Sequence, residues 1–149
     1  MGEPATILIV EDDFNDKELA LLAFKKLGVI EEVKVLEDGS EALDYIFCKG
    51  EFSDRKFKQV LKMILLDLKI PKVDGLDVLE QIKQDERTKM VPVIILTSSR
   101  QEDDIQKGYD LNVNSYIVKP VDFDDYVETV QQVGEYWLIV MRTENWTQQ

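Results

Sequence analysis

The sequence predicts an α/β protein with a five-stranded parallel sheet and helices on both faces. Short apolar runs of strand length alternate along the chain with amphipathic stretches of helix length. No repeat, low-complexity tract or linker interrupts this alternation. Strands that alternate with helices form parallel sheets covered on both faces, and right-handed crossovers make such a sheet doubly wound. We expect the strand order 2-1-3-4-5.

Local periodicity predicts the individual elements. In the first helix, Ala20, Ala23, Phe24 and Leu27 recur at helical spacing, and Gly28 follows as a stop signal. The expected strands cover residues 6–10, 33–36, 63–66, 93–96 and 115–118. The expected helices cover residues 15–27, segments around 42–46 and 78–82, residues 103–111, and a last helix from about residue 122.

Length, composition and charge restrict the class of protein. A chain of 149 residues, 44% apolar and 32% charged, is typical of one globular domain. The net charge of −12 argues against a nucleic-acid partner, because phosphate contacts need clustered Lys and Arg. No apolar run approaches the roughly 18 residues of a membrane span, and the N-terminus lacks signal-peptide features. The single cysteine, Cys48, suits a reducing compartment, so we expect a cytoplasmic location and no membrane partner.

The chain contains no histidine. This excludes a histidine base, a histidine metal ligand and a role as a phosphohistidine carrier. Any histidine that takes part in phosphoryl chemistry here has to come from a partner protein.

Polar side chains directly follow four of the five expected strands. They are Glu11, Asp12 and Asp13 after the first strand, Asp67 after the third, Thr97 and Ser98 after the fourth, and Lys119 and Pro120 after the fifth. Ligands of open α/β sheets bind outside the carboxyl ends of the strands. Because strands one, three, four and five are neighbours in the expected order, these residues should meet in one crevice.

The residue types in this crevice predict phosphoryl transfer. Carboxylates that lie close together repel one another unless a cation compensates them, and their hard oxygen atoms, with water and a phosphate, suit Mg2+. An aspartate beside such a cation can attack phosphorus and form an aspartyl phosphate. A lysine and a hydroxyl group, here Lys119 and Thr97, stabilise the transferring phosphoryl group.

The motifs ILIVEDD, LLDLKIPKVDG, ILTSS and SYIVKP resemble the receiver domain of two-component response regulators over roughly residues 5–133. The resemblance implies a switch that accepts a phosphoryl group from a sensor histidine kinase onto Asp67, with Mg2+ as cofactor. It implies that Asp12 binds the metal directly and Glu11 through water. Asp67 and the backbone carbonyl of Lys69 would complete the metal site.

The same resemblance assigns the remaining site residues. Thr97 would donate a hydrogen bond to the phosphoryl group, and Lys119 would pair with it. Tyr116 falls at the aromatic switch position, although simple half-buried packing is an alternative for its ring. The bond between Lys119 and Pro120 is expected to be cis. Such a protein is no classical enzyme, because it catalyses only phosphotransfer to its own aspartate and hydrolysis from it.

Two residues depart from the commonest pattern of the family. Glu11 stands where an aspartate is usual, and its longer side chain should still serve an indirect ligand. Lys69 lies two residues after the acceptor, where it is either a solvated loop residue or a residue that tunes the phosphoryl lifetime. We expect Asp13 to cap the first helix instead of binding metal.

Other proteins of this flavodoxin-like architecture fit less well. The acidic EDDFND loop would repel the phosphate of a flavodoxin cofactor. A dehydrogenase would carry GxGxxG after the first strand, and a haloacid-dehalogenase-like phosphatase would carry DxD there. A degenerate receiver that acts as an unphosphorylated docking module is the alternative.

We expect a single receiver domain over residues 1–149 that signals by protein contact. The connection 48–62 is long for this kind of sheet and rich in Lys and Arg, either as a solvated insertion or as a docking site for the kinase. The last helix, at about 122–141, ends in YWLIVM, which is apolar on all sides and has to be buried. The insertion could cover it, or a homodimer could. The chain also resembles regulators associated with phytochrome-type kinases.

Overall fold

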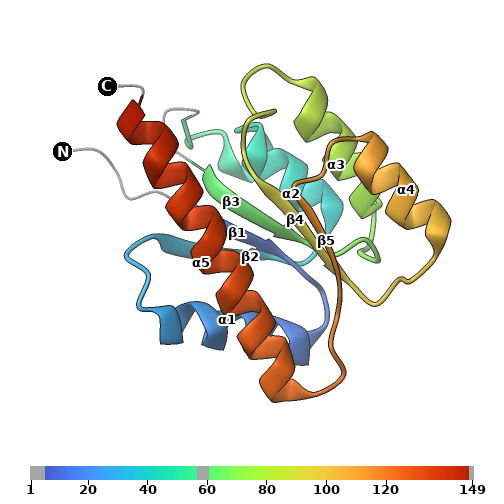
Figure 1. The fold of residues 1–149 in the computed structure, drawn as a ribbon. Coiled ribbons are helices and arrows are strands. Elements are labelled where there is room, and N and C mark those ends of the chain that lie inside the picture. Colours follow the sequence, from blue (N-terminus) through green and yellow to red (C-terminus); the bar gives the residue numbers. More distant parts are fainter. Residues whose placement is uncertain (1–5, 57–60, 148–149) are drawn as a thin grey trace.

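The computed structural model describes residues 6–56 and 61–147, with side chains up to residue 140. Its strands form one parallel sheet with the order β2-β1-β3-β4-β5 (Figure 1). The strands are β1 (Thr6–Val10), β2 (Glu32–Leu36), β3 (Leu61–Leu66), β4 (Val93–Thr97) and β5 (Ser115–Val118). This confirms the predicted fold class and strand order. Because β3 begins at Leu61, the last residues of the predicted connection belong to this strand.

Helices follow each strand, as the alternation predicts. They are α1 (Phe14–Leu27), α2 (Gly39–Ile46), α3 (Gly75–Gln84), α4 (Glu102–Asp110) and α5 (Phe123–Thr147), with a short 3-10 helix η1 (Gly50–Phe52) after α2. Aspartate side chains cap the first turns of α1, α2 and α3, which satisfies backbone N–H groups that have no partner within the helix. The helix α5 continues past residue 141, where the sequence analysis ended it.

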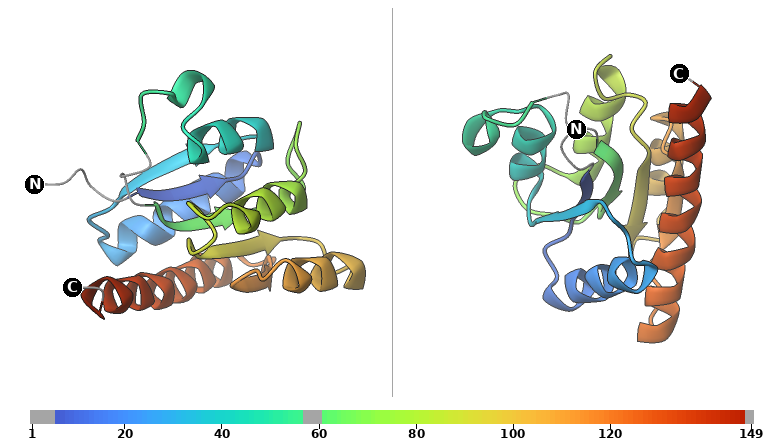
Figure 2. Two further views of the ribbon diagram at one scale, coloured as in Figure 1. Left: turned by 90° about the horizontal axis from the view of Figure 1, so that it is seen from above. Right: turned by 90° about the vertical axis from the view of Figure 1, so that its left-hand side faces the viewer.

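The helices cover the two faces of the sheet (Figure 2). On one face, α1 and α5 enclose a core that includes Ile7 and Ile9 of β1. On the other, α2 and α3 enclose a core that includes Leu8 and Val10. Successive side chains of a strand point to opposite faces. Strands buried on both sides therefore appear in the sequence as continuous apolar runs.

Close packing of α5 against α1 buries much of its apolar stripe. A Cβ atom on Gly134 would lie 2.9 Å from the Phe24 ring, so the absence of a side chain lets the two helices approach. Leu138 is buried in the same core. The half-buried Trp137 donates a hydrogen bond from Nε1 to Ser115 Oγ over 3.3 Å.

Two residues of the YWLIVM segment lie on the surface. Tyr136 is 59% exposed and Ile139 is 51% exposed, and the YWLIVM segment is thus only partly covered by its own chain. The side chain of Met141, the last residue of that segment, lies outside the described residues.

The described part of the connection packs on α2. Arg55 Nη1 donates hydrogen bonds to the carbonyl oxygens of Tyr45 (3.0 Å) and Ile46 (3.4 Å). The Phe52 ring meets the Tyr45 ring edge-on at 5.1 Å. Residues 50–56 lie on the opposite side of the sheet from α5 (Figure 2), so the expectation that this insertion covers the final helix is wrong for its described part. Residues 57–60 lie outside the described residues.

The bond between Lys119 and Pro120 is trans, and the expectation of a cis bond is therefore wrong. The trans form of an X–Pro bond is favoured by about 0.5–1 kcal/mol.

Candidate functional site

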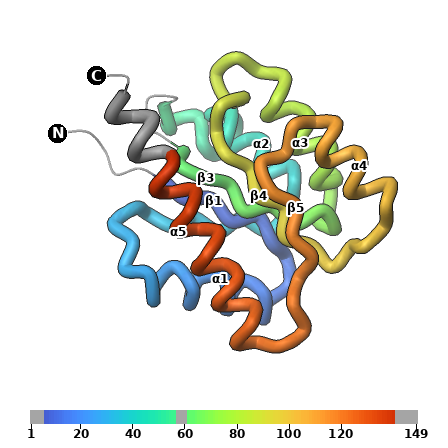
Figure 3. Tube along the Cα trace, in the orientation of Figure 1, coloured from blue at the N-terminus to red at the C-terminus, as the bar shows by residue number. Residues whose placement is uncertain are grey.

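The loops after β1, β3, β4 and β5 reach the same edge of the sheet (Figure 3). The backbone ladder continues one residue past several strands and fixes the first loop residue. The N–H of Glu11 donates to Leu36 O (3.0 Å), and that of Asp67 donates to Val10 O (3.1 Å). At the other side of the crevice, Lys119 N donates to Thr97 O over 2.8 Å. The parallel topology thus brings these residues together, as predicted.

The ammonium group of Lys119 lies among three carboxylates. Its Nζ atom is 2.8 Å from Asp67 Oδ2, 2.5 Å from Glu11 Oε1 and 2.6 Å from Asp16 Oδ2. Asp67 and Glu11 are buried, and the Lys119 side chain is only 11% exposed. Charge-assisted hydrogen bonds of this kind are shorter and stronger than neutral ones, so Lys119 stabilises the close approach of the three carboxylates.

Burial and charge shift the pKa values in this cluster. Burial alone lowers the pKa of Lys119, but hydrogen bonds to Asp16, Asp67 and Glu11 outweigh it and raise that pKa well above its ordinary value. Burial and the charge of Asp67 raise the pKa of Glu11 to about 7, although Lys119 acts in the opposite direction. One cation facing three carboxylates leaves a surplus of negative charge in the crevice.

The sequence analysis missed Asp16. This residue lies in the first turn of α1 and reaches the crevice from the helix instead of from a strand end. Its signal was present in the EDDFND segment. In that segment, Asp13 caps α1 by accepting a hydrogen bond from Asp16 N over 2.9 Å, as predicted, and this cap sets where α1 begins.

The four residues proposed to hold a metal ion are only partly gathered. Glu11 and Asp67 face the same ammonium group, and Lys69 N donates to Asp67 Oδ1 over 3.1 Å. Asp12 is exposed. Within residues 6–56 and 61–140, no three Asp, Glu or Cys side chains form a group that could hold a metal ion as they stand. The surplus of buried carboxylate charge nevertheless suits a hard divalent cation.

Thr97 and Tyr116 lie beside the crevice on β4 and β5. Thr97 is buried, and its Oγ1 accepts a hydrogen bond from Ser99 N over 3.4 Å. The half-buried Tyr116 donates its hydroxyl to Ser99 O over 3.1 Å, and burial raises the pKa of this phenol. Both residues therefore contact the loop between β4 and α4.

A close approach at Gly75 brings the start of α3 against the loop of Asp67. A Cβ atom at this position would lie 2.5 Å from Asp67 O and 2.6 Å from Leu68 Cα. The N–H of Gly75 donates to Leu68 O over 3.1 Å. Any larger residue at position 75 would displace the loop that carries Asp67.

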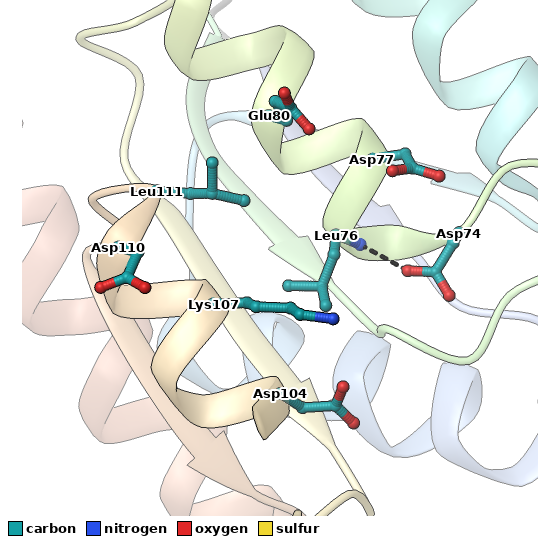
Figure 4. A pocket seen from close by; sticks show the side chains of 8 residues that line it. All are labelled: Asp74, Leu76, Asp77, Glu80, Asp104, Lys107, Asp110 and Leu111. Carbon is teal, nitrogen blue, oxygen red and sulfur yellow. Dashed lines mark hydrogen bonds between the residues drawn. The ribbon is translucent and has the colours of Figure 1, made fainter. Parts of the chain in front are cut away.

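A groove of about 570 Å³ lies between α3 and α4 beside the crevice (Figure 4). Its lining is mainly acidic and comprises Asp74, Leu76, Asp77, Glu80, Asp104, Lys107, Asp110 and Leu111. Asp104, in the first turn of α4, also contacts the β4–α4 loop through Ser99 and the β3–α3 loop through Lys69.

Comparison with protein families gives the class that this arrangement defines. The model of the response regulator receiver domain matches residues 7–131, and the chain belongs to this family. It is 42% identical over 136 residues to the probable methanogenesis regulatory protein FilR2 of Methanothrix harundinacea, covering 91% of this chain and 85% of that protein. It is 37% identical over 135 residues to response regulator Rcp1 of Synechocystis sp., covering 91% and 90%.

Solved structures of such relatives share the fold. The Mn2+-bound form of response regulator Rcp1 has a TM-score of 0.84 at 37% identity, with 91% of this chain and 95% of that chain covered. The phosphorylated cyanobacterial phytochrome response regulator RcpA has a TM-score of 0.84 at 38% identity, with the same coverage. No helix in the described part of our chain is long and apolar enough to cross a membrane.

Proposed function

We propose that the chain accepts a phosphoryl group on Asp67 from a histidine of a sensor kinase and passes the signal by protein contact. The observation that carries this proposal is the buried Asp67 carboxylate with Lys119 Nζ 2.8 Å away. A carboxylate oxygen of Asp67 would attack phosphorus while the phosphorus–nitrogen bond of the kinase phosphohistidine breaks. The partner has to supply that histidine, because this chain has none.

We assign Lys119 and Thr97 to the stabilisation of the transferring group. Lys119 would stay in contact with the Asp67 carboxyl group and neutralise negative charge on the phosphoryl oxygens. Thr97 would donate its hydroxyl to one of these oxygens. Tyr116 would report the change, since its hydroxyl already contacts the same β4–α4 loop as Thr97.

Glu11, Asp12, Asp67 and the carbonyl of Lys69 would hold Mg2+, which supplies positive charge beside the acceptor. The Mn2+-bound form of Rcp1 supports a divalent cation in such a domain. Glu11 would reach the metal through water, and Lys119 would contact the phosphoryl group.

Mass spectrometry after treatment with acetyl phosphate and Mg2+ tests the proposal. The wild type should gain one phosphate, and Asp67→Asn should gain none. Asp85→Asn is the matched control, because Asp85 is a carboxylate at the end of α3 that pairs with Arg87 and should leave phosphorylation unchanged. A wild type that gains no phosphate would favour the unphosphorylated docking module instead.

We further propose a kinase of the phytochrome type as the phosphoryl donor, in the cytoplasm. The likeness to the phosphorylated cyanobacterial phytochrome response regulator RcpA supports this choice. Phosphotransfer from a purified phytochrome-type kinase should be faster than from kinases of other sensor classes. Equal rates from all of them would contradict this donor.

We also propose a homodimer that buries the exposed residues at the end of α5. Tyr136 and Ile139 together present apolar surface there, and each large apolar side chain gains roughly 1.5–3 kcal/mol on full burial. Sedimentation should detect a dimer of the wild type that Ile139→Glu weakens. A wild type that is monomeric at high concentration, with or without acetyl phosphate, would contradict the dimer.

A further inference from the structure

Asp104 connects three segments that surround the phosphorylation site. Its Oδ2 atom accepts the hydroxyl of Ser99 over 2.5 Å and lies 3.8 Å from the ammonium of Lys69. Ser99 belongs to the β4–α4 loop, Lys69 follows the acceptor in the β3–α3 loop, and Asp104 itself lies in the first turn of α4. One carboxylate oxygen thus faces both loops.

The two partners of Asp104 are themselves tied to the site. The backbone N–H of Lys69 donates to Asp67 Oδ1 over 3.1 Å, while its side chain points to Asp104. The backbone of Ser99 contacts Thr97 Oγ1 through its N–H and the Tyr116 hydroxyl through its carbonyl. Lys69, which lies two residues after Asp67, is therefore held by a residue that does not belong to the strand ends around the crevice.

We propose that Asp104 is a positioning residue of the phosphorylation site, which holds the Lys69 ammonium away from Asp67 and releases it when a phosphoryl group arrives. This inference rests on the proposed function of Asp67. A phosphoryl group adds close to two negative charges and three acceptor oxygens two residues from Lys69. The Lys69 side chain is 58% exposed, and exposed ion pairs are weak, so Lys69 can exchange one anionic partner for the other.

Competition for one cation has a definite consequence. The free energy of the ion pair between Lys69 and Asp104 opposes the state in which a phosphoryl group occupies Asp67. By linkage, removal of the ion pair favours that state. Release of Lys69 also leaves the carboxylate of Asp104 without its cation at the end of the groove between α3 and α4 (Figure 4). Phosphorylation would therefore increase the negative charge of this groove.

Calorimetric titration with beryllofluoride in the presence of Mg2+ tests the inference, because this anion takes the place of a phosphoryl group on a carboxylate. Asp104→Asn should bind it roughly two- to fivefold more tightly than the wild type, the range expected for one partly exposed ion pair. An asparagine at this position still offers an oxygen to the Ser99 hydroxyl, so the loop contact is kept. The affinity for Mg2+ alone should stay unchanged.

Two further variants separate positioning of Lys69 from a general effect of charge. Asp103→Asn removes the same charge from the same turn of α4 at an exposed position and should leave the affinity within about 1.5-fold of the wild type. Lys69→Met should abolish the gain, so that Asp104→Asn has no effect in its background. A gain that persists without Lys69, or that Asp103→Asn reproduces, would overturn the inference.

The outcomes also distinguish this inference from the proposed function. A wild type that binds beryllofluoride with an affinity equal to that of Asp104→Asn would refute the positioning role and leave Asp67 as the acceptor. Absence of binding to the wild type would overturn both. If Asp104→Asn does not fold, Asp104→Ser can replace it. Lys69→Met alone should then bind beryllofluoride more weakly than the wild type.

Discussion

Lys119 and Lys83 lie at opposite ends of the sheet and show what the partners of a buried lysine decide. Lys119 faces three carboxylates at the carboxyl ends of the strands. Lys83, near the end of α3, donates to neutral oxygens: Lys89 O (3.4 Å), Val91 O (3.3 Å) and Asn114 Oδ1 (2.9 Å). The pKa of Lys119 is raised, whereas burial lowers the pKa of Lys83.

Burial of a lysine alone therefore does not define a chemical site. Both side chains lose solvation, which disfavours a charged lysine. The neutral oxygens around Lys83 compensate this loss of solvation only in part. The role of Lys83 is structural: it donates to Asn114 Oδ1, which also accepts from Val93 N over 2.8 Å. The three carboxylates around Lys119 more than compensate its loss of solvation. The cluster keeps a surplus of negative charge that phosphoryl chemistry and a metal ion can use.

Removal of Lys119 should have the largest effect on stability. Lys119→Met leaves three neighbouring carboxylates without a cation, and loss of one partner of a buried pair costs about 3–5 kcal/mol. We expect a loss of this size in the free energy of unfolding at pH 8 without Mg2+, measured by urea denaturation. The loss should shrink at pH 5, because the pKa of Glu11 is raised to about 7 and its protonation removes one of the three negative charges. An equal loss at both pH values would contradict the electrostatic account.

Glu11→Gln should have a smaller effect on stability, of the opposite sign. The pKa of Glu11 rises from 4.5 to about 7 on folding, so the folded state binds more protons than the unfolded state between these values. The free energy of unfolding of the wild type therefore falls as pH rises through this window. Glutamine cannot ionise, and Glu11→Gln should be more stable than the wild type by roughly 1–3 kcal/mol at pH 8 and similar to it at pH 4.

Urea denaturation across pH 4–8 without Mg2+ checks this expectation. Glu86→Gln is a suitable control, because Glu86 is exposed and pairs with Lys89 at 2.8 Å, and the substitution should leave the pH profile of the wild type unchanged. A Glu11→Gln variant that keeps the wild-type profile would assign the pH dependence to another group.

Lys83→Met should have the smallest effect. It removes hydrogen bonds to neutral oxygens, and we expect a loss of about 1 kcal/mol. Because folding lowers the pKa of Lys83 below its ordinary 10.5, the unfolded state binds more protons as pH rises toward that value. The wild type should therefore gain stability relative to Lys83→Met as alkaline pH is approached. A difference that is largest at neutral pH and declines above it would contradict this assignment.

Local patterns in the sequence determined the fold and most of the crevice. Apolar runs and helical spacings are properties of short segments, and parallel topology forces the carboxyl ends of the strands to one edge. Asp67, Thr97 and Lys119 were therefore found without the structure. The cap at Asp13 was found for the same reason, because a cap depends on residues within one turn.

Contacts between side chains of different elements depend on how those elements pack. Asp16 reaches Lys119 from the first turn of α1, and Asp104 joins Ser99 to Lys69 from the first turn of α4. The close approach of α5 to α1 at Gly134, which the sequence did not reveal, buries Leu138 on its own chain and leaves Tyr136 and Ile139 exposed. Periodicity fixes which face of an element is buried, whereas contacts between charged side chains depend on the position of every neighbouring element and on the sum of their charges.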